Sequence, residues 1–161
     1  MTAQIGETLH YQGESLTMAT EPLEIYFAMG GRNPGFWPGS TALHRGYEGC
    51  WEITDGRLYL VKLTAMFISG TPASLQSIFP GYPDRVFAHW YSGTLRIPQG
   101  VRLRYVHGGY LSEYEKDLML EIEKGVVQRA WVRDNAAAAA TAESGESAKT
   151  ADFSSTGEGA R

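Results

Sequence analysis

The sequence predicts a mainly β (α+β) fold: a curved antiparallel sheet of about eight strands, barrel-like or sandwich, with two short helices. Three observations predict this class. Short runs of alternating apolar and polar residues recur along the chain, glycine-containing turns separate them, and only two stretches have helical spacing. The 19 glycines and 9 tyrosines in 161 residues also suit a turn-rich β protein.

Three hairpins supply most of the strands. The clearest turn is Asp55-Gly56, because a type I′ turn needs positive φ at both positions. In the last hairpin, apolar and polar residues alternate along the first strand. This pattern predicts a buried face and a solvent-exposed face, and Asp117 lies on the exposed one. The expected pairs are Thr8–Tyr11 with Ser15–Met18, Gly46–Thr54 with Arg57–Thr64, and Glu113–Glu123 with Val126–Arg133.

The middle of the chain predicts two more strands. Arg85–Ile97 is expected to form one long strand with a bend at Gly93. The turn residues Pro98-Gln99-Gly100 then lead into a separate strand, Val101–His107.

Two stretches are expected to be helical. In TEPLEIYFAMGG, Thr20 is expected to cap a short helix, Pro22 lies in its first turn, and Gly30 or Gly31 ends it. A second short helix is expected in PASLQSIF, which follows Thr71.

Composition divides the chain into one compact β-rich domain, residues 1–133, and an acidic tail rich in alanine, serine and glycine, residues 134–161. The tail has too little apolar surface to fold, so we expect it to be disordered. A net charge of −4 argues against a nucleic-acid partner. No basic leader or long apolar run is present, so we expect a soluble, cytoplasmic protein that does not bind membranes.

Motifs for catalysis, cofactors and metals are absent from the sequence. The four histidines are scattered, and there is no H-E-x-x-H, C-x-x-C, P-loop or G-x-S-x-G pattern. We therefore expect no metal, no cofactor and no catalytic residue. The single cysteine, Cys50, lies between Glu48 and Glu52, whose like charges disfavour a thiolate, so we expect it to be structural.

The candidate binding residues are aromatic and charged side chains on the expected strands. Arginine and tyrosine together are typical of binding hot spots. On a regular strand His89 and Trp90 point to opposite faces, and the pattern leaves open which face is buried. The candidates for binding a partner or a ligand are Arg45, Tyr47, His89, Trp90, Arg96, Arg102, Arg104, Tyr105 and His107.

Three stretches of the chain resemble a group of short bacterial proteins of unassigned function. The stretches are STALHRGYEGCWEI, FPGYPDRVFAHWYSGTLRIPQG and YEKDLMLEIEKGVV, and the likeness extends over roughly residues 4–133. The resemblance implies a bacterial origin and a single compact domain. It implies no activity and no site residue.

Two functions remain as hypotheses. The first is a non-enzymatic binding module, such as an adaptor or an immunity-like inhibitor, whose partner is another protein. The second is a small-molecule or hydrolase- or isomerase-type pocket in the concavity of the sheet around His89. The second requires at least two of His44, Glu48, His89 and His107 to converge, with Arg96 as an anion partner. A purely structural role is also compatible with the sequence.

Overall fold

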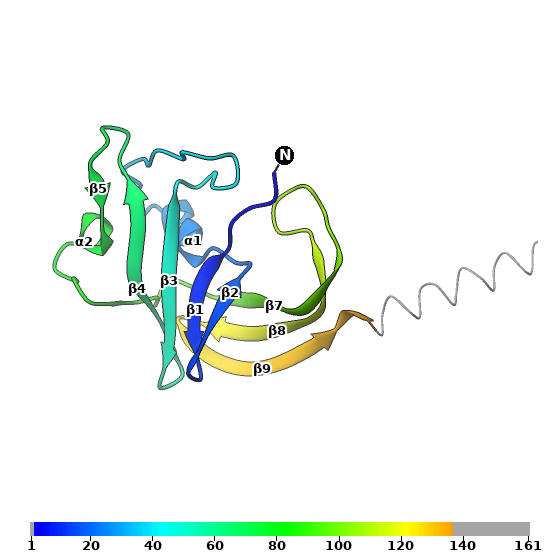
Figure 1. The fold of residues 1–161 in the computed structure, drawn as a ribbon. Coiled ribbons are helices and arrows are strands. Elements are labelled where there is room, and N and C mark those ends of the chain that lie inside the picture. The colour runs from blue at the N-terminus through cyan, green and yellow to red at the C-terminus, as the bar shows by residue number, and fades with distance from the viewer. Residues whose placement is uncertain (1, 137–161) are drawn as a thin grey trace, which may run out of the picture.

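A computed structural model describes residues 2–136 of the chain. Within this range nine strands form a single sheet with two short helices, which confirms the predicted mainly β class (Figure 1). From residue 137 onward the predicted disordered tail lies outside the described residues. The strands are β1 (Glu7–Tyr11), β2 (Glu14–Met18), β3 (Tyr47–Thr54), β4 (Arg57–Met66), β5 (Pro72–Ala73), β6 (Val86–Phe87), β7 (Gly93–Arg104), β8 (Glu113–Glu123) and β9 (Val126–Asp134), and the helices are α1 (Pro22–Ala28) and α2 (Leu75–Ile78).

The sheet is strongly curved and open. Its strand order is β2-β1-β3-β4-β9-β8-β7, and β5 and β6 also pair with β4. All pairs are antiparallel except β1 with β3, which is parallel. Figure 1 shows β7, β8 and β9 running across the ends of the upright strands β1, β3 and β4. The sheet is therefore neither the closed barrel nor the sandwich that the sequence left open.

The three predicted hairpins are confirmed, and their turns use the expected residues. The second residue of each turn is a glycine with positive φ, namely Gly13 (80°), Gly56 (72°) and Gly125 (82°). Asp55 precedes its glycine with φ of 52°, which is the backbone conformation that a type I′ turn requires. Local turn chemistry thus sets the register of each hairpin.

The predicted continuous strand Arg85–Ile97 is wrong between its two ends, because only Val86–Phe87 (β6) and Gly93–Ile97, the start of β7, are strand residues. Only the two residues of β6 pair with β4, and the chain then turns inward so that Ala88, Trp90 and Tyr91 are all buried. The indole N–H of Trp90 donates to the Pro22 carbonyl at 2.9 Å. Burying two large aromatic side chains in sequence stabilises the core more than continuing a regular ladder, in which one of them would face solvent.

The predicted break at Pro98-Gln99-Gly100 is also wrong. β7 continues through these residues to Arg104, and a register shift against β8 absorbs Gly100, whose φ is 81°. Proline is tolerated because β7 is an end strand of the sheet.

The helices are shorter than predicted. α1 has Glu21 at its N-cap with no side-chain cap, and the Thr20 hydroxyl instead accepts a hydrogen bond from the backbone N–H of Arg96 at 2.9 Å. Only four residues of the second stretch form α2. Leu23 of α1 is completely buried and belongs to the same hydrophobic core as Tyr47 and Trp51.

Candidate functional site

A pocket lies at the seam between the two end strands of the sheet. β2 and β7 do not pair, but the N–H of Ala19, just after β2, donates to the carbonyl of Arg96 in β7 at 2.8 Å. Both residues line a pocket of about 130 Å³. A cavity of about 150 Å³ holds benzene, so this pocket admits one small group rather than a nucleotide. Its polar and aromatic lining includes Gln4, Arg96, Arg102, Tyr105, Tyr110 and Tyr114.

Two segments far apart in sequence form the wall of this pocket. Figure 1 shows the N-terminal segment beside the loop between β7 and β8, and Ala3 forms a parallel bridge with Gly109 there. The N–H of Gln4 donates to the Gly109 carbonyl at 2.8 Å, and the Tyr110 hydroxyl donates to the Ile5 carbonyl at 3.1 Å. Tyr110 therefore connects this wall of the pocket to the buried polar side chains that lie behind it.

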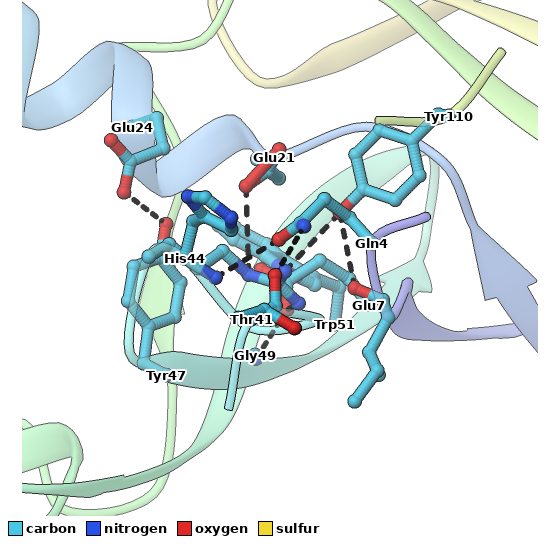
Figure 2. A network of polar contacts seen from close by, with 12 residues as sticks. Gln4, Glu7, Glu21, Glu24, Thr41, His44, Tyr47, Gly49, Trp51 and Tyr110 are labelled. Atoms are coloured by element: carbon cyan, nitrogen blue, oxygen red, sulfur yellow. Dashed lines mark hydrogen bonds and ion pairs between the residues drawn. The ribbon is translucent and has the colours of Figure 1, made fainter. Parts of the chain in front are cut away.

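The buried polar side chains behind this wall form a network around Glu7 (Figure 2). Arg45 Nη2 lies 3.0 Å from Glu7 Oε2, and the two side chains are 3% and 0% exposed. The same guanidinium donates from Nη1 to Tyr110 Oη at 3.2 Å, and its Nε lies 3.6 Å from Glu21 Oε1. The network thus connects β1, the segment before β3, and the loop after β7. The other donors to the Glu7 carboxylate are Gly49 N and Trp51 Nε1.

Burial dominates the electrostatics of this network. It raises the pKa of Glu7 from 4.5 to about 7, against the opposing effects of Arg45 and of the hydrogen bonds. Burial also raises the pKa of Tyr110 and of Tyr47, whose hydroxyl donates to Glu24 at 2.9 Å. Because Glu7 and Arg45 are closed off from solvent, they position the Tyr110 wall and do not meet a ligand directly.

The raised pKa of Glu7 predicts that the protein loses stability as pH rises. Its folded pKa of about 7 lies above 4.5, so stability is fully present below about pH 4.5 and is lost as pH rises through about 7. The expected loss is about 3 kcal/mol between these limits. Chemical denaturation of Glu7→Gln should not show this fall, whereas Glu48→Gln, an exposed control on β3, should retain it. The assignment is wrong if both variants retain the fall.

A second buried carboxylate, that of Asp117, holds Arg96 in the lining of the pocket. Asp117 was expected on the solvent-exposed face of its strand, but it is 0% exposed. Arg96 Nε lies 3.1 Å from Asp117 Oδ1, and the guanidinium also donates to the carbonyls of Tyr110 and Ser112 at 2.7 and 3.0 Å. The loop after β7 thus folds over this face and buries it. The other partners of Asp117 are Arg133 and Asn135.

The pKa of Asp117 lies below its ordinary value. Burial alone would raise it, but hydrogen bonds from Asn135 and Arg133 and the charge of Arg96 outweigh burial. The carboxylate therefore stays charged and fixes the Arg96 guanidinium in the pocket lining.

The nine residues predicted from the sequence do not form one surface. Arg96, Arg102 and Tyr105 meet at the pocket. Arg45, Tyr47 and Trp90 are buried, because the first belongs to the ionic network and the other two belong to the core. The remaining three, His89, Arg104 and His107, are exposed.

The residues of the small-molecule hypothesis do not converge. His89 Nδ1 lies 3.2 Å from the Phe87 carbonyl, and His107 Nδ1 lies 2.9 Å from Tyr105 Oη. Among residues 2–136, no hydrogen bond or ion pair joins any two of His44, Glu48, His89 and His107. The structure therefore does not provide the contact that this hypothesis requires.

Next to the pocket, the distal parts of β7 and β8 form a two-stranded ribbon. With the loop residues that adjoin the two strands it comprises residues 100–105 and 111–115, which we call the arm. β9 ends at Asp134, opposite Lys116, so beyond that point β8 has no second neighbouring strand among residues 2–136. Every residue from 100 to 105 is exposed. The exposed large apolar residues of the arm are Val101 (66%), Leu103 (45%), Tyr105 (51%) and Leu111 (66%).

The arm also carries two cations on its β7 strand. Arg102 stacks on the Tyr105 ring with 4.8 Å between its Cζ and the ring centroid, and it makes no ion pair with any described residue. Arg104 likewise has no ion-pair partner within residues 2–136, although Glu113 lies opposite it in β8. Both guanidinium groups are thus available to an anion.

Sequence reasoning missed Glu7, Tyr110 and Asp117. A signal existed for Glu7, because strand alternation places it on the same face as the buried Leu9. No local signal identified Asp117, because its burial depends on a loop that folds back over the sheet.

Comparisons with protein-family models, with curated proteins and with solved structures gave no match. Among residues 2–136, no group of three or more histidine, cysteine, aspartate or glutamate side chains is arranged to hold a metal ion. In the same range, no helix has the length and apolar character needed to cross a membrane.

Proposed function

We propose that this protein is a small non-enzymatic binding module that recognises another protein through the arm. The observation that carries the proposal is the exposure of the alternate residues Val101, Leu103 and Tyr105 on a ribbon that has no third strand in the part of the chain that the structure describes. Exposed apolar side chains that gather on one element are typical of interaction sites. Tyrosine and arginine, which lie among them, are enriched at binding hot spots.

The chemistry of the arm favours an extended, acidic segment as the partner. β7 is an end strand, and beyond Arg96 its outer edge makes no backbone hydrogen bond to any other described segment. A partner strand can therefore add to this edge through main-chain hydrogen bonds. Acidic side chains at neighbouring positions would lie beside Arg102 and Arg104, and the adjacent pocket has room for one anchoring side chain.

Site-specific photo-crosslinking of the full chain in its host tests this proposal. A photoreactive phenylalanine analogue at Leu103 should capture one discrete protein, whereas the same group at Thr64, an exposed control on β4, should not. Arg102→Glu should weaken the captured complex about tenfold, or about 1.4 kcal/mol. Arg32→Glu reverses an exposed charge outside the arm and should leave the complex unchanged.

The proposal fails if Leu103 and Thr64 give the same crosslinks, or if Arg102→Glu and Arg32→Glu have equal effects. Arg102 and Leu103 make no hydrogen bond or ion pair with other described side chains, so these substitutions should leave the fold intact. Circular dichroism spectra of the variants check this point.

A further inference from the structure

On the face of the β1–β3 pair that points away from the hydrophobic core, three polar side chains form a connected row. Cys50 Sγ of β3 lies 3.1 Å from His10 Nε2 of β1. His10 Nδ1 lies 2.8 Å from Ser15 Oγ of β2. The parallel pairing of β1 with β3 brings the first two together, and the hairpin register places Ser15 directly opposite His10.

This arrangement has the geometry of an activated nucleophile. A nucleophile within hydrogen-bond reach of a base, and a base oriented by a third group, are the features that distinguish a reactive thiol from a structural one. If the His10 ring donates from Nδ1 to the Ser15 hydroxyl, then Nε2 is the nitrogen that accepts the proton of Cys50.

We propose that Cys50 is a reactive thiol that exchanges with low-molecular-weight disulfides, with His10 as its general base and Ser15 as a positioning residue. The Cys50 thiol gives its proton to His10 Nε2 while its sulfur attacks one sulfur of the disulfide. The S–S bond of the reagent breaks, and the released thiolate takes up the proton. The products are a mixed disulfide at Cys50 and one free thiol, so atoms and electrons balance without a further oxidant.

The charged groups around Cys50 disfavour a thiolate in the resting protein, so they favour removal of the proton by a general base during the attack. Burial raises the pKa of the Cys50 thiol, the charge of Lys62 opposes this effect, and Glu52 and Glu7 add to it. Glu48 lies on the same face of β3 as Cys50 and contributes a further negative charge. The thiol therefore stays protonated near neutral pH, and its reactivity depends on a base that removes the proton as the S–S bond forms.

The exposure of this row supports access by a small reagent. His10 is exposed and Cys50 is half-buried. The chain has only this one cysteine, so every mixed disulfide formed reports on the site. This inference concerns a different face from the arm and does not depend on the proposed function.

Thiol exchange of the full chain with 4,4′-dithiodipyridine, followed by absorbance, tests the inference. At pH 7 wild type should react roughly 100-fold faster than His10→Gln, as expected for a positioned base. Wild type should also show a normal solvent deuterium isotope effect that His10→Gln loses, because the proton moves in the rate-limiting step. Ser15→Ala should react at an intermediate rate, since the ring is present but less well oriented.

Lys62→Met serves as the matched control, because Lys62 lies opposite Cys50 in β4. The inference is overturned if His10→Gln reacts as fast as wild type, or if Lys62→Met slows the reaction as much as His10→Gln does. An inverse isotope effect in wild type would also overturn it, because that result indicates a thiolate formed before the attack. The three variants should have far-UV spectra like that of wild type.

Discussion

Replacing Arg45 with methionine is expected to lower the free energy of unfolding by about 3–5 kcal/mol at alkaline pH. Methionine fills a similar volume, but it leaves the Glu7 carboxylate, which is 0% exposed, without its cationic partner. The cost should shrink in mildly acidic solution, because Glu7 has a pKa of about 7 and becomes neutral there. Urea denaturation at several pH values measures both effects.

The double variant Glu7→Gln/Arg45→Met is the control for this prediction. Removing both charges should be less destabilising than removing Arg45 alone, because no uncompensated charge is then buried. A cost for Arg45→Met that is independent of pH, together with no recovery in the double variant, would show that Arg45 acts through packing alone.

Replacing Asp117 with alanine is expected to cost about 3 kcal/mol, the lower end of the range for a broken buried ion pair. The lower end applies because Arg96 and Arg133 are 22% and 53% exposed and regain hydration. The loop after β7 should also lose protection in hydrogen exchange, since Arg96 holds the carbonyls of Tyr110 and Ser112. Thermal unfolding and exchange at neutral pH measure the two effects.

The dependence on pH separates this prediction from a simple loss of packing. The pKa of Asp117 is lowered, so its stabilisation is present above the ordinary aspartate range and is lost as pH falls through the folded value. Asp117→Ala should therefore flatten the acid limb of the stability curve. Asp117→Asn, which retains the volume and one acceptor oxygen, should cost less at neutral pH. Equal losses for both variants, with an unchanged acid limb, would contradict the assignment.

Together the two buried carboxylates give the stability curve opposite slopes. Asp117 lowers stability when it gains a proton, and Glu7 lowers stability when it loses one. Both carboxylates support the walls of the same pocket, Glu7 through Arg45 and Tyr110, and Asp117 through Arg96. The arm and its pocket are thus held by charged groups whose partners lie far away in the sequence.

The elements that depend on neighbouring residues were predictable from the sequence. The hairpins formed as expected, because glycines such as Gly56 and Gly125 supply the positive φ that tight turns require. The arm residues Arg102 and Tyr105 were also recognised as binding candidates by their chemistry. Their place beside Arg96 in the lining of one pocket was not predicted, because the turn expected at Pro98-Gln99-Gly100 would have separated them, whereas β7 continues through these residues.

Tertiary structure alone decided which polar residues are buried and which of them meet. Trp90 turned inward instead of continuing a strand, because the core behind α1 accommodates its ring and the Pro22 carbonyl accepts its N–H. Cys50 gained a histidine neighbour through the parallel pairing of β1 with β3, which the sequence pattern does not reveal. Turn geometry follows from the backbone preferences of a few adjacent residues, whereas desolvation and ion pairing depend on segments that only the folded chain brings together.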